Sequence, residues 1–282
     1  MPTTLNEFKQ QKFDVNGITM NVVIEGKGPD VLLLHGFPDS HSIWRFQIPA
    51  LVAAGYRVIA PDLRGFGDTD MSLMVGDYHI DNLVKDVIGL LDAVKAKKVL
   101  MAGHDWGSVL GWFVALRHPD RVKAYVAMSV GHPTCYATGG MQQKIKGWYT
   151  VFFQLRGLAE RVLTMNNFAY FDKFTKCPIE MPDWRKSLSR PGRLTAGLNW
   201  YRANMAMILP RNHGSVQMPV MGMYSTGDVA LIEEQMSRSG DYCSAGWRYE
   251  RLEGVGHWMT SEAPDKVNSL LVNYFDEHKS KK

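Results

Sequence analysis

The stretch KVLMAGHDWGSVLGWFVALRHP (residues 98–119) decides the fold. Its first eight residues form a short apolar run, as expected of a strand that is covered on both faces. The following residues are apolar at helical spacing and continue to the final proline. Gly103 and Gly107 flank the junction, and Asp105 lies at its centre. Because small residues let a strand and a helix approach closely around a strained central residue, we predict a sharp strand–turn–helix elbow here.

The alternation of strand and helix continues on both sides of this elbow. Strands that alternate with helices form right-handed βαβ units, so we expect an α/β fold with a mostly parallel central sheet flanked by helices. Asn16-Gly17 between two alternating runs predicts a hairpin before the first parallel strand. The other segments with these patterns are the apolar runs VLLLHG (31–36), YRVIAPD (56–62) and VKAYVAMSV (122–130) and the helical run DNLVKDVIGLLDAV (81–94).

The alternation stops in the middle of the chain. From about Thr134 to His213 the sequence shows helical patterns, many aromatic residues and no convincing strand. Strand and helix then resume and end in a predicted helix from Ala263 to about His278. We therefore predict an α/β core domain formed by residues 1–133 and 214–282, with a helical cap domain of residues 134–213 inserted between its two halves.

The composition excludes several classes of protein. Of the 282 residues, 45% are hydrophobic and 21% are charged, which excludes global disorder. The net charge of +4 gives no reason to expect nucleic acid as a partner. The apolar runs are too short for a membrane span, and the polar first ten residues do not resemble a signal peptide. Cys135, Cys177 and Cys243 lie far apart, as expected of reduced thiols, so we expect a cytoplasmic protein and leave a homodimer open.

The side chain at the centre of the elbow determines which chemistry is expected. The Asp105 carboxylate is ionised at neutral pH and needs no base to become a nucleophile. Attack on an ester carbonyl would give only an anhydride, whereas attack on a saturated carbon gives a covalent alkyl-enzyme ester. Hydrolysis of that ester requires a base and an oxyanion hole. An aspartate at this position is also a common helix N-cap, so a catalytic role depends on finding those partners.

Candidate partners follow in chain order. Asp228 ends STGD (225–228) after one predicted strand, and His257 lies in the glycine-rich GVGHW (254–258) after the next. The backbone N–H groups of Phe37, in HGFP, and of Trp106 are candidates for the oxyanion hole. The histidines lack metal-ligand spacing and no nucleotide-binding fingerprint is present, so we expect neither a metal nor a cofactor.

These motifs together resemble the α/β-hydrolase superfamily and, within it, the epoxide hydrolases. The resemblance covers nearly the whole chain and includes the order nucleophile, acid, histidine. It implies hydrolysis of a small apolar epoxide by water to a vicinal diol. It further implies that Asp105 is the nucleophile, His257 the base and Asp228 its orienting acid. The motifs are HGFPDSHSIWR (35–45), GYRVIAPDLRGFGDTD (55–70), GHDWGSVLGW (103–112), LNWYRANM (198–205), STGD and GVGHW.

The resemblance also implies hydroxyl donors from the insert. Tyr201, in NWYR, resembles the cap tyrosine that holds the epoxide oxygen as the ring opens. The family usually supplies a second tyrosine from early in the insert, and that position aligns best with Phe152. Tyr149 lies about one helical turn earlier and could reach the same face. Trp148, Tyr149 and Phe152 are therefore candidates for the substrate pocket.

Two alternatives stay open. Haloalkane dehalogenases share the fold, the aspartate nucleophile and the tryptophan that follows it, but they usually have asparagine at the position of Phe37. Trp148 could then supply the second halide donor in its place. A ligand-binding protein with this fold and no turnover is a third hypothesis, which the complete set of Asp105, Asp228 and His257 disfavours.

Overall fold

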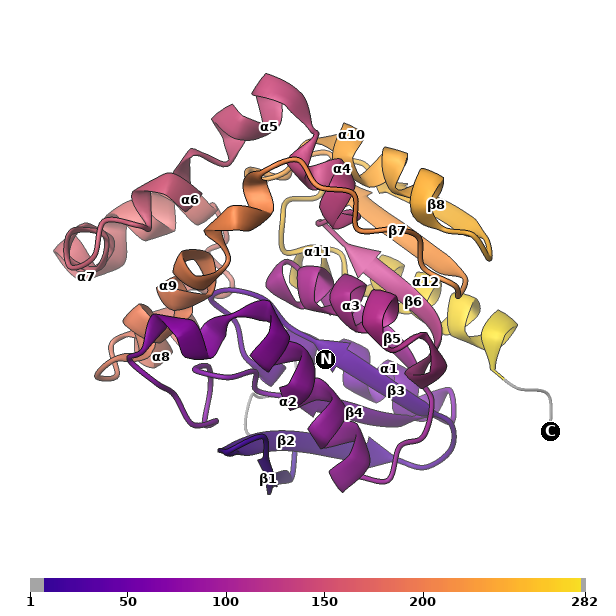
Figure 1. Cartoon of the computed structure of the whole chain (residues 1–282). Helices are drawn as coiled ribbons and strands as arrows, with labels where there is room; N and C mark the ends of the chain where they lie inside the picture. The colour runs from indigo at the N-terminus through magenta and orange to yellow at the C-terminus, as the bar shows by residue number, and fades with distance from the viewer. Residues whose placement is uncertain (1–7, 280–282) are drawn as a thin grey trace.

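The computed structural model describes residues 8–279, and an eight-stranded sheet runs through the middle of the molecule (Figure 1). The strands are β1 (Gln10–Val15), β2 (Ile18–Gly26), β3 (Asp30–Leu34), β4 (Arg57–Pro61), β5 (Val99–His104), β6 (Val122–Met128), β7 (Val220–Ser225) and β8 (Trp247–Leu252). Their order in the sheet is β1-β2-β4-β3-β5-β6-β7-β8. The pairs β1–β2 and β2–β4 are antiparallel, and every neighbouring pair from β4 to β8 is parallel. The predicted α/β fold with a mostly parallel sheet is therefore confirmed.

The hairpin at the start of the described chain forms for the expected reason. Asn16 and Gly17 connect β1 to β2, and both residues have positive φ angles, 46° and 77°. A two-residue hairpin turn with two positive φ angles matches the right-handed twist of the strands that it joins. Asparagine and glycine tolerate this conformation better than other residues do.

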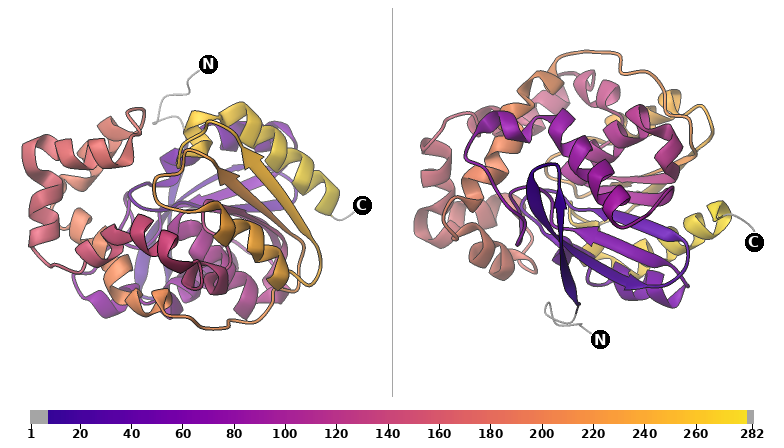
Figure 2. Two further views of the ribbon diagram at one scale, coloured as in Figure 1. Left: turned by 90° about the horizontal axis from the view of Figure 1, so that it is seen from above. Right: turned by 60° about the horizontal axis from the view of Figure 1, so that its bottom comes forward.

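Helices cover both faces of the sheet. The helices α1 (Gln47–Ala53) and α12 (Pro264–His278) pack against each other on one face. The helices α2 (Ile80–Ala93) and α3 (Trp106–Arg117) pack together on the opposite face (Figure 2). The central strand β5 is buried along its whole length, as its unbroken apolar run predicts.

The chain between β6 and β7 lies outside these layers. Figure 1 shows its helices over the edge of the sheet at which the parallel strands end. Residues on this edge come from the ends of several strands, so a roof over it encloses side chains that are distant in sequence. The helices of this segment are α4 (Pro133–Ala137), α5 (Gly140–Lys146), α6 (Trp148–Phe152), α7 (Leu158–Thr175), α8 (Met181–Leu188), α9 (Arg193–Ala203) and the 3-10 helix η4 (Met205–Ile208).

Buried polar contacts hold this segment on the core. Two nitrogens of Arg45, in the core, donate hydrogen bonds to the carboxylate of Glu180 at 3.1 and 2.6 Å. The indole N–H of Trp184, on α8, donates to Asp39 at 2.8 Å. All four residues are buried. A shift of α8 that broke these bonds would leave a buried charge without a partner, which is costly. The bonds therefore hold α8 in one position on the core.

Two further observations concern the lengths of the helices and the state of the cysteines. Within residues 8–279, each helix is too short or too polar to cross a membrane. Cys135, Cys177 and Cys243 are free thiols. Burial raises the pKa of the Cys135 thiol to about 11, so the reactive thiolate form is rare at neutral pH.

Candidate active site

The elbow between β5 and α3 has the conformation that its sequence predicts. Asp105 has φ of 53° and ψ of −121°, a strained combination for a residue with a side chain. A Cβ on Gly103 would collide with the backbone of Gly107, and a Cβ on Gly107 would collide with the backbone oxygen of Leu34. The two glycines therefore allow β3, β5 and α3 to come close enough to hold Asp105 in this conformation.

The Asp105 carboxylate is buried, with 7% of the residue exposed. Its Oδ1 accepts a hydrogen bond from the backbone N–H of Phe37 at 2.8 Å. Its Oδ2 lies 3.6 Å from Nε2 of His257. Trp106 begins α3, where a backbone N–H has no acceptor within the helix. A Cβ on Gly36 would collide with the carboxylate, so glycine at that position leaves room for it.

His257 is held by the carboxylate of Asp228. Nδ1 of His257 lies 2.8 Å from Oδ2 of Asp228, and Oδ1 of Asp228 accepts the amides of Ala230 and Leu231 at 2.8 and 2.9 Å. Burial alone would raise the pKa of Asp228, but the charge of His257 and these hydrogen bonds lower it. Burial opposes protonation of His257, yet the charges of Asp228 and Asp105 raise its pKa to about 10. The imidazole is thus oriented and made strongly basic by two carboxylates.

Two further histidines of the motifs, His104 and His35, have structural positions. His104 bonds through Nε2 to the backbone oxygen of His257 at 2.9 Å, and Nε2 of His35 accepts the amide of Leu63 at 2.9 Å. Burial lowers the pKa of each to about 4, so both are neutral at physiological pH. Within residues 8–279, no three His, Cys, Asp or Glu side chains converge as ligands of a metal ion would.

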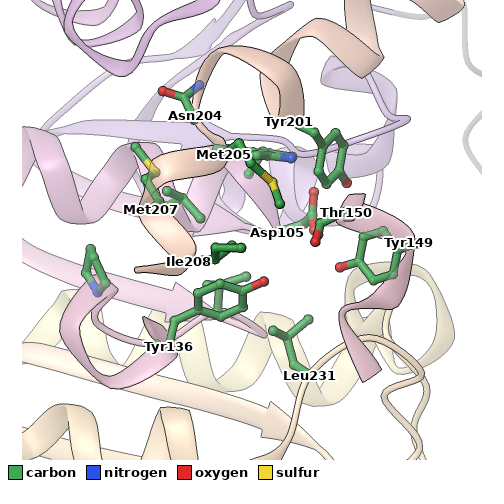
Figure 3. A pocket seen from close by; sticks show the side chains of 15 residues that line it. Asp105, Tyr136, Tyr149, Thr150, Tyr201, Asn204, Met205, Met207, Ile208 and Leu231 are labelled. Carbon is green, nitrogen blue, oxygen red and sulfur yellow. The ribbon is translucent and has the colours of Figure 1, made fainter. Parts of the chain in front are cut away.

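Two tyrosines from the inserted helices face Asp105 (Figure 3). Tyr201, on α9, packs its ring against Trp106 and Phe37 with centroid distances of 5.1 and 5.6 Å. Tyr149, on α6, lies 6.0 Å from Tyr201 between ring centroids. Burial and the Asp105 charge hold the pKa of both phenols well above the usual value. Both hydroxyls therefore stay protonated and can donate hydrogen bonds.

Two small cavities meet at these groups, and Asp105, Tyr149 and Tyr201 line both of them. The first cavity has a volume of about 70 Å³ and extends toward η4. The second cavity, of about 30 Å³, includes His257. The remaining lining of the first cavity is Trp106, Val109, Val130, Gly131, Pro133, Tyr136, Thr150, Asn204, Met205, Met207, Ile208 and Leu231. That of the second is Phe37, Pro38, Phe153, Phe171, Phe174, Thr175, Val229, Ala230 and Trp258.

The structure separates the three pocket candidates of α6. Tyr149 lines both cavities. Trp148 and Phe152 are absent from both linings, as far as residues 8–279 describe them. Trp148 is 42% exposed and packs against Phe152 and Phe174. Residues three and four apart are both neighbours on a helix, so spacing alone does not distinguish Phe152 from Tyr149. The packing of α6 in the fold directs Tyr149 to the cavities and Phe152 to the ring of Trp148. Of the three pocket candidates, Tyr149 therefore lines the cavities, and the expected pocket positions of Trp148 and Phe152 are corrected.

Sequence reasoning missed two residues near the site. Tyr136, on α4, lines the first cavity, and its position soon after β6 at the edge where strands end was a usable signal. Asp39, the last residue of HGFPD, accepts the indole N–H groups of Trp184 and Trp258 at 2.8 and 3.2 Å. Its contact with Trp184 is invisible in the sequence because 145 positions separate the two residues.

Comparisons with known proteins identify related sequences and structures. A family model described as alpha/beta hydrolase fold matches residues 29–264. Epoxide hydrolase A of Mycobacterium tuberculosis is 30% identical over 93% of this chain and 95% of its own. An AB hydrolase superfamily protein of Bacillus subtilis is 33% identical over 94% of this chain and 97% of its own. The crystal structure of an epoxide hydrolase from Vigna radiata superposes with a TM-score of 0.85 at 27% identity, covering 98% of this chain and 100% of that one.

The chain belongs to the α/β-hydrolase fold family. Within that family it belongs with the epoxide hydrolases, since relatives of that name, including human epoxide hydrolase 4 at 30% identity, are covered over most of their length.

Proposed function

We propose that this protein hydrolyses small apolar epoxides to vicinal diols through a covalent ester on Asp105. The observation that carries the proposal is one carboxylate, Asp105, facing two buried phenols from the insert and the His257–Asp228 pair from the core. A carboxylate nucleophile suits attack on a saturated carbon, and a phenol suits protonation of the oxygen that leaves it.

Ring opening is the first step. Oδ2 of Asp105 forms a bond to one ring carbon while the bond between that carbon and the ring oxygen breaks. Tyr149 and Tyr201 hold the ring oxygen, and one phenol proton passes to the new alkoxide. Because Oδ1 accepts the Phe37 amide at 2.8 Å, it becomes the carbonyl oxygen of the ester. The dry, mostly apolar lining strengthens each of these polar contacts.

Hydrolysis of the ester is the second step. Esterification removes the charge of Asp105, one of the two charges that raise the pKa of His257, so the imidazole then gives its proton to the tyrosinate that ring opening left. Neutral His257 takes a proton from water as the water oxygen bonds to the ester carbonyl. Phe37 and Trp106 stabilise the oxyanion through their backbone amides. Collapse breaks the bond to the alkyl oxygen, which takes the proton of the new carboxyl hydroxyl and leaves as part of the diol. The Asp105 carboxylate and protonated His257 are thereby restored.

We further propose that residues 134–213 act as a cap domain on the core formed by residues 1–133 and 214–282. Support comes from the position of Tyr149 and Tyr201 on α6 and α9, whereas Asp105, Asp228 and His257 follow core strands. Among the described residues that line the cavities, the nucleophile belongs to the core and the phenol donors belong to the insert. The three free thiols support a reducing location such as the cytoplasm.

The test is turnover together with trapping of the intermediate. Wild-type protein is given a panel of epoxides and of haloalkanes, scored for diol and for halide. We expect diol from epoxides, none with Asp105→Ala, and a stable adduct with His257→Gln that adds the full mass of the epoxide. His79→Gln, at an exposed histidine, is the matched control and should turn over normally. Halide release without diol would instead establish the dehalogenase alternative. The adduct on His257→Gln would then add the mass of the haloalkane minus that of the hydrogen halide.

A further inference from the structure

A third phenol in the first cavity has no role in the mechanism above. Tyr136, on α4, points its hydroxyl into this cavity from the side opposite Tyr149 (Figure 3). Within residues 8–279, no side chain or backbone group forms a hydrogen bond with this hydroxyl. Burial, and to a smaller extent the charge of Asp105, raise the pKa of Tyr136 to about 12, so the hydroxyl is a donor at neutral pH.

The position of Tyr136 differs from that of the two phenols assigned to ring opening. Tyr149 and Tyr201 line both cavities and pack near each other beside Asp105. Tyr136 lines only the first cavity. Two donors already suit the lone pairs of one epoxide oxygen, so a third donor displaced along the first cavity suits a different atom of the substrate.

The surroundings of Tyr136 specify the chemistry of that atom. Most of the side chains around Tyr136 in this lining are aliphatic or thioether groups. A bound ligand without an acceptor there would leave the phenol hydroxyl without a hydrogen bond, which costs free energy away from water. The described lining of the first cavity includes no Lys, Arg or His, and it does include the Asp105 carboxylate, which repels an anion. An uncharged acceptor oxygen is therefore favoured over a carboxylate.

Apart from the groups of the mechanism, the second cavity as described within residues 8–279 has one hydroxyl, that of Thr175, which donates to the backbone oxygen of Asp172 at 3.3 Å. Its outer wall is largely aromatic, with Phe153, Phe171 and Phe174 from the insert. The two substituents of an epoxide would thus meet different environments. A substituent with an acceptor oxygen fits the first cavity, and a purely hydrocarbon substituent fits the second.

We propose that Tyr136 is a specificity-determining residue that donates a hydrogen bond to an uncharged ether or carbonyl oxygen on the epoxide substituent that occupies the first cavity. The inference rests on the proposed function, because it describes the substrate of the same site. It makes glycidyl ethers and related oxygen-bearing epoxides better substrates than hydrocarbon epoxides of the same shape.

The kinetic test uses allyl glycidyl ether and its carbon isostere, in which a methylene replaces the ether oxygen. The net value of a neutral hydrogen bond corresponds to about 2- to 10-fold in kcat/KM. Tyr136→Phe should lower kcat/KM for the ether by that factor and leave the isostere unchanged. Tyr170→Phe, at a tyrosine of α7 that is 41% exposed, is the matched control and should change neither value. Equal losses for both substrates, or no loss for either, would overturn the proposal.

A binding test separates this inference from the proposed function. In an Asp105→Ala background, which cannot form the ester, dissociation constants of the same two epoxides are measured through the fluorescence of Trp106 and its neighbours. The ether should bind about 2- to 10-fold more tightly than the isostere, and adding Tyr136→Phe should remove the difference. If the wild type yields no diol but this difference is present, the proposed activity fails and the role of Tyr136 stands. If diol forms but the two ligands bind equally, Tyr136 has no such role.

Discussion

Replacing Glu180 with alanine should destabilise the protein strongly, because it leaves a buried arginine unpaired. Glu180 immediately precedes α8, and its carboxylate accepts two nitrogens of Arg45 at 2.6 and 3.1 Å and the hydroxyl of Ser261. The side chains of Arg45 and Glu180 are 9% and 2% exposed. Removing one partner of such a pair costs about 3–5 kcal/mol, a large share of the roughly 5–15 kcal/mol by which proteins are stable.

The assay is equilibrium unfolding in urea, followed by tryptophan fluorescence and circular dichroism. The double variant Arg45→Met/Glu180→Leu removes both charges and should recover most of the loss, because the cost arises from the unpaired charge. Asp68→Ala breaks an exposed pair with Arg190 that also joins core and insert, and it should cost at most about 1 kcal/mol. A Glu180→Ala cost as small as that of Asp68→Ala would refute the reasoning, since it would mean that water reaches Arg45.

Three other predictions concern the catalytic groups and the elbow. Tyr149→Phe should slow diol formation by about 10- to 100-fold, the value of a hydrogen bond to a developing charge, whereas Phe152→Leu should stay near the wild-type rate in the same assay. The pKa of His257 is higher in the folded than in the unfolded chain, so the folded chain holds the proton more tightly. Stability should therefore be greatest below about pH 6.5 and decline as the pH rises toward 10. His257→Gln should flatten this decline in urea unfolding at a series of pH values, and an identical pH profile in both proteins would contradict it. Gly107→Ala should lower the melting temperature, since its Cβ would overlap the backbone of β3 and overpacking costs about 1–3 kcal/mol or more. Gly76→Ala, where a Cβ meets open space, should leave the melting temperature nearly unchanged.

The parts of the fold that depend on short-range pattern were predictable. The apolar run before Asp105 and the helical run after it are observed as β5 and α3, and Asn16-Gly17 is observed as a hairpin turn. Hydrophobic periodicity reports which face of an element is buried, and turn residues report backbone angles. Both are properties of neighbouring residues, so one sequence suffices to recognise them.

The contacts within the site were predictable only in part. The association of Asp105, Asp228 and His257 was inferred from a motif order, and the structure brings the three side chains together. The sequence could not decide whether Tyr149 or Phe152 lines the cavities, because that depends on how α6 is rotated against the core. A rotation of a helix by one residue exchanges the side chains that face a cavity, and local propensity does not determine that rotation.

The amino-acid sequence alone specified the alternating strands and helices, the elbow and the carboxylate nucleophile, because each depends on residues close together in the chain. The folded chain specified which phenols face Asp105, how Glu180 holds the insert on the core and where Tyr136 meets the first cavity. Those features join residues up to 135 positions apart, as Arg45 and Glu180 show. Their formation depends on the packing of whole elements against each other, which no local pattern encodes.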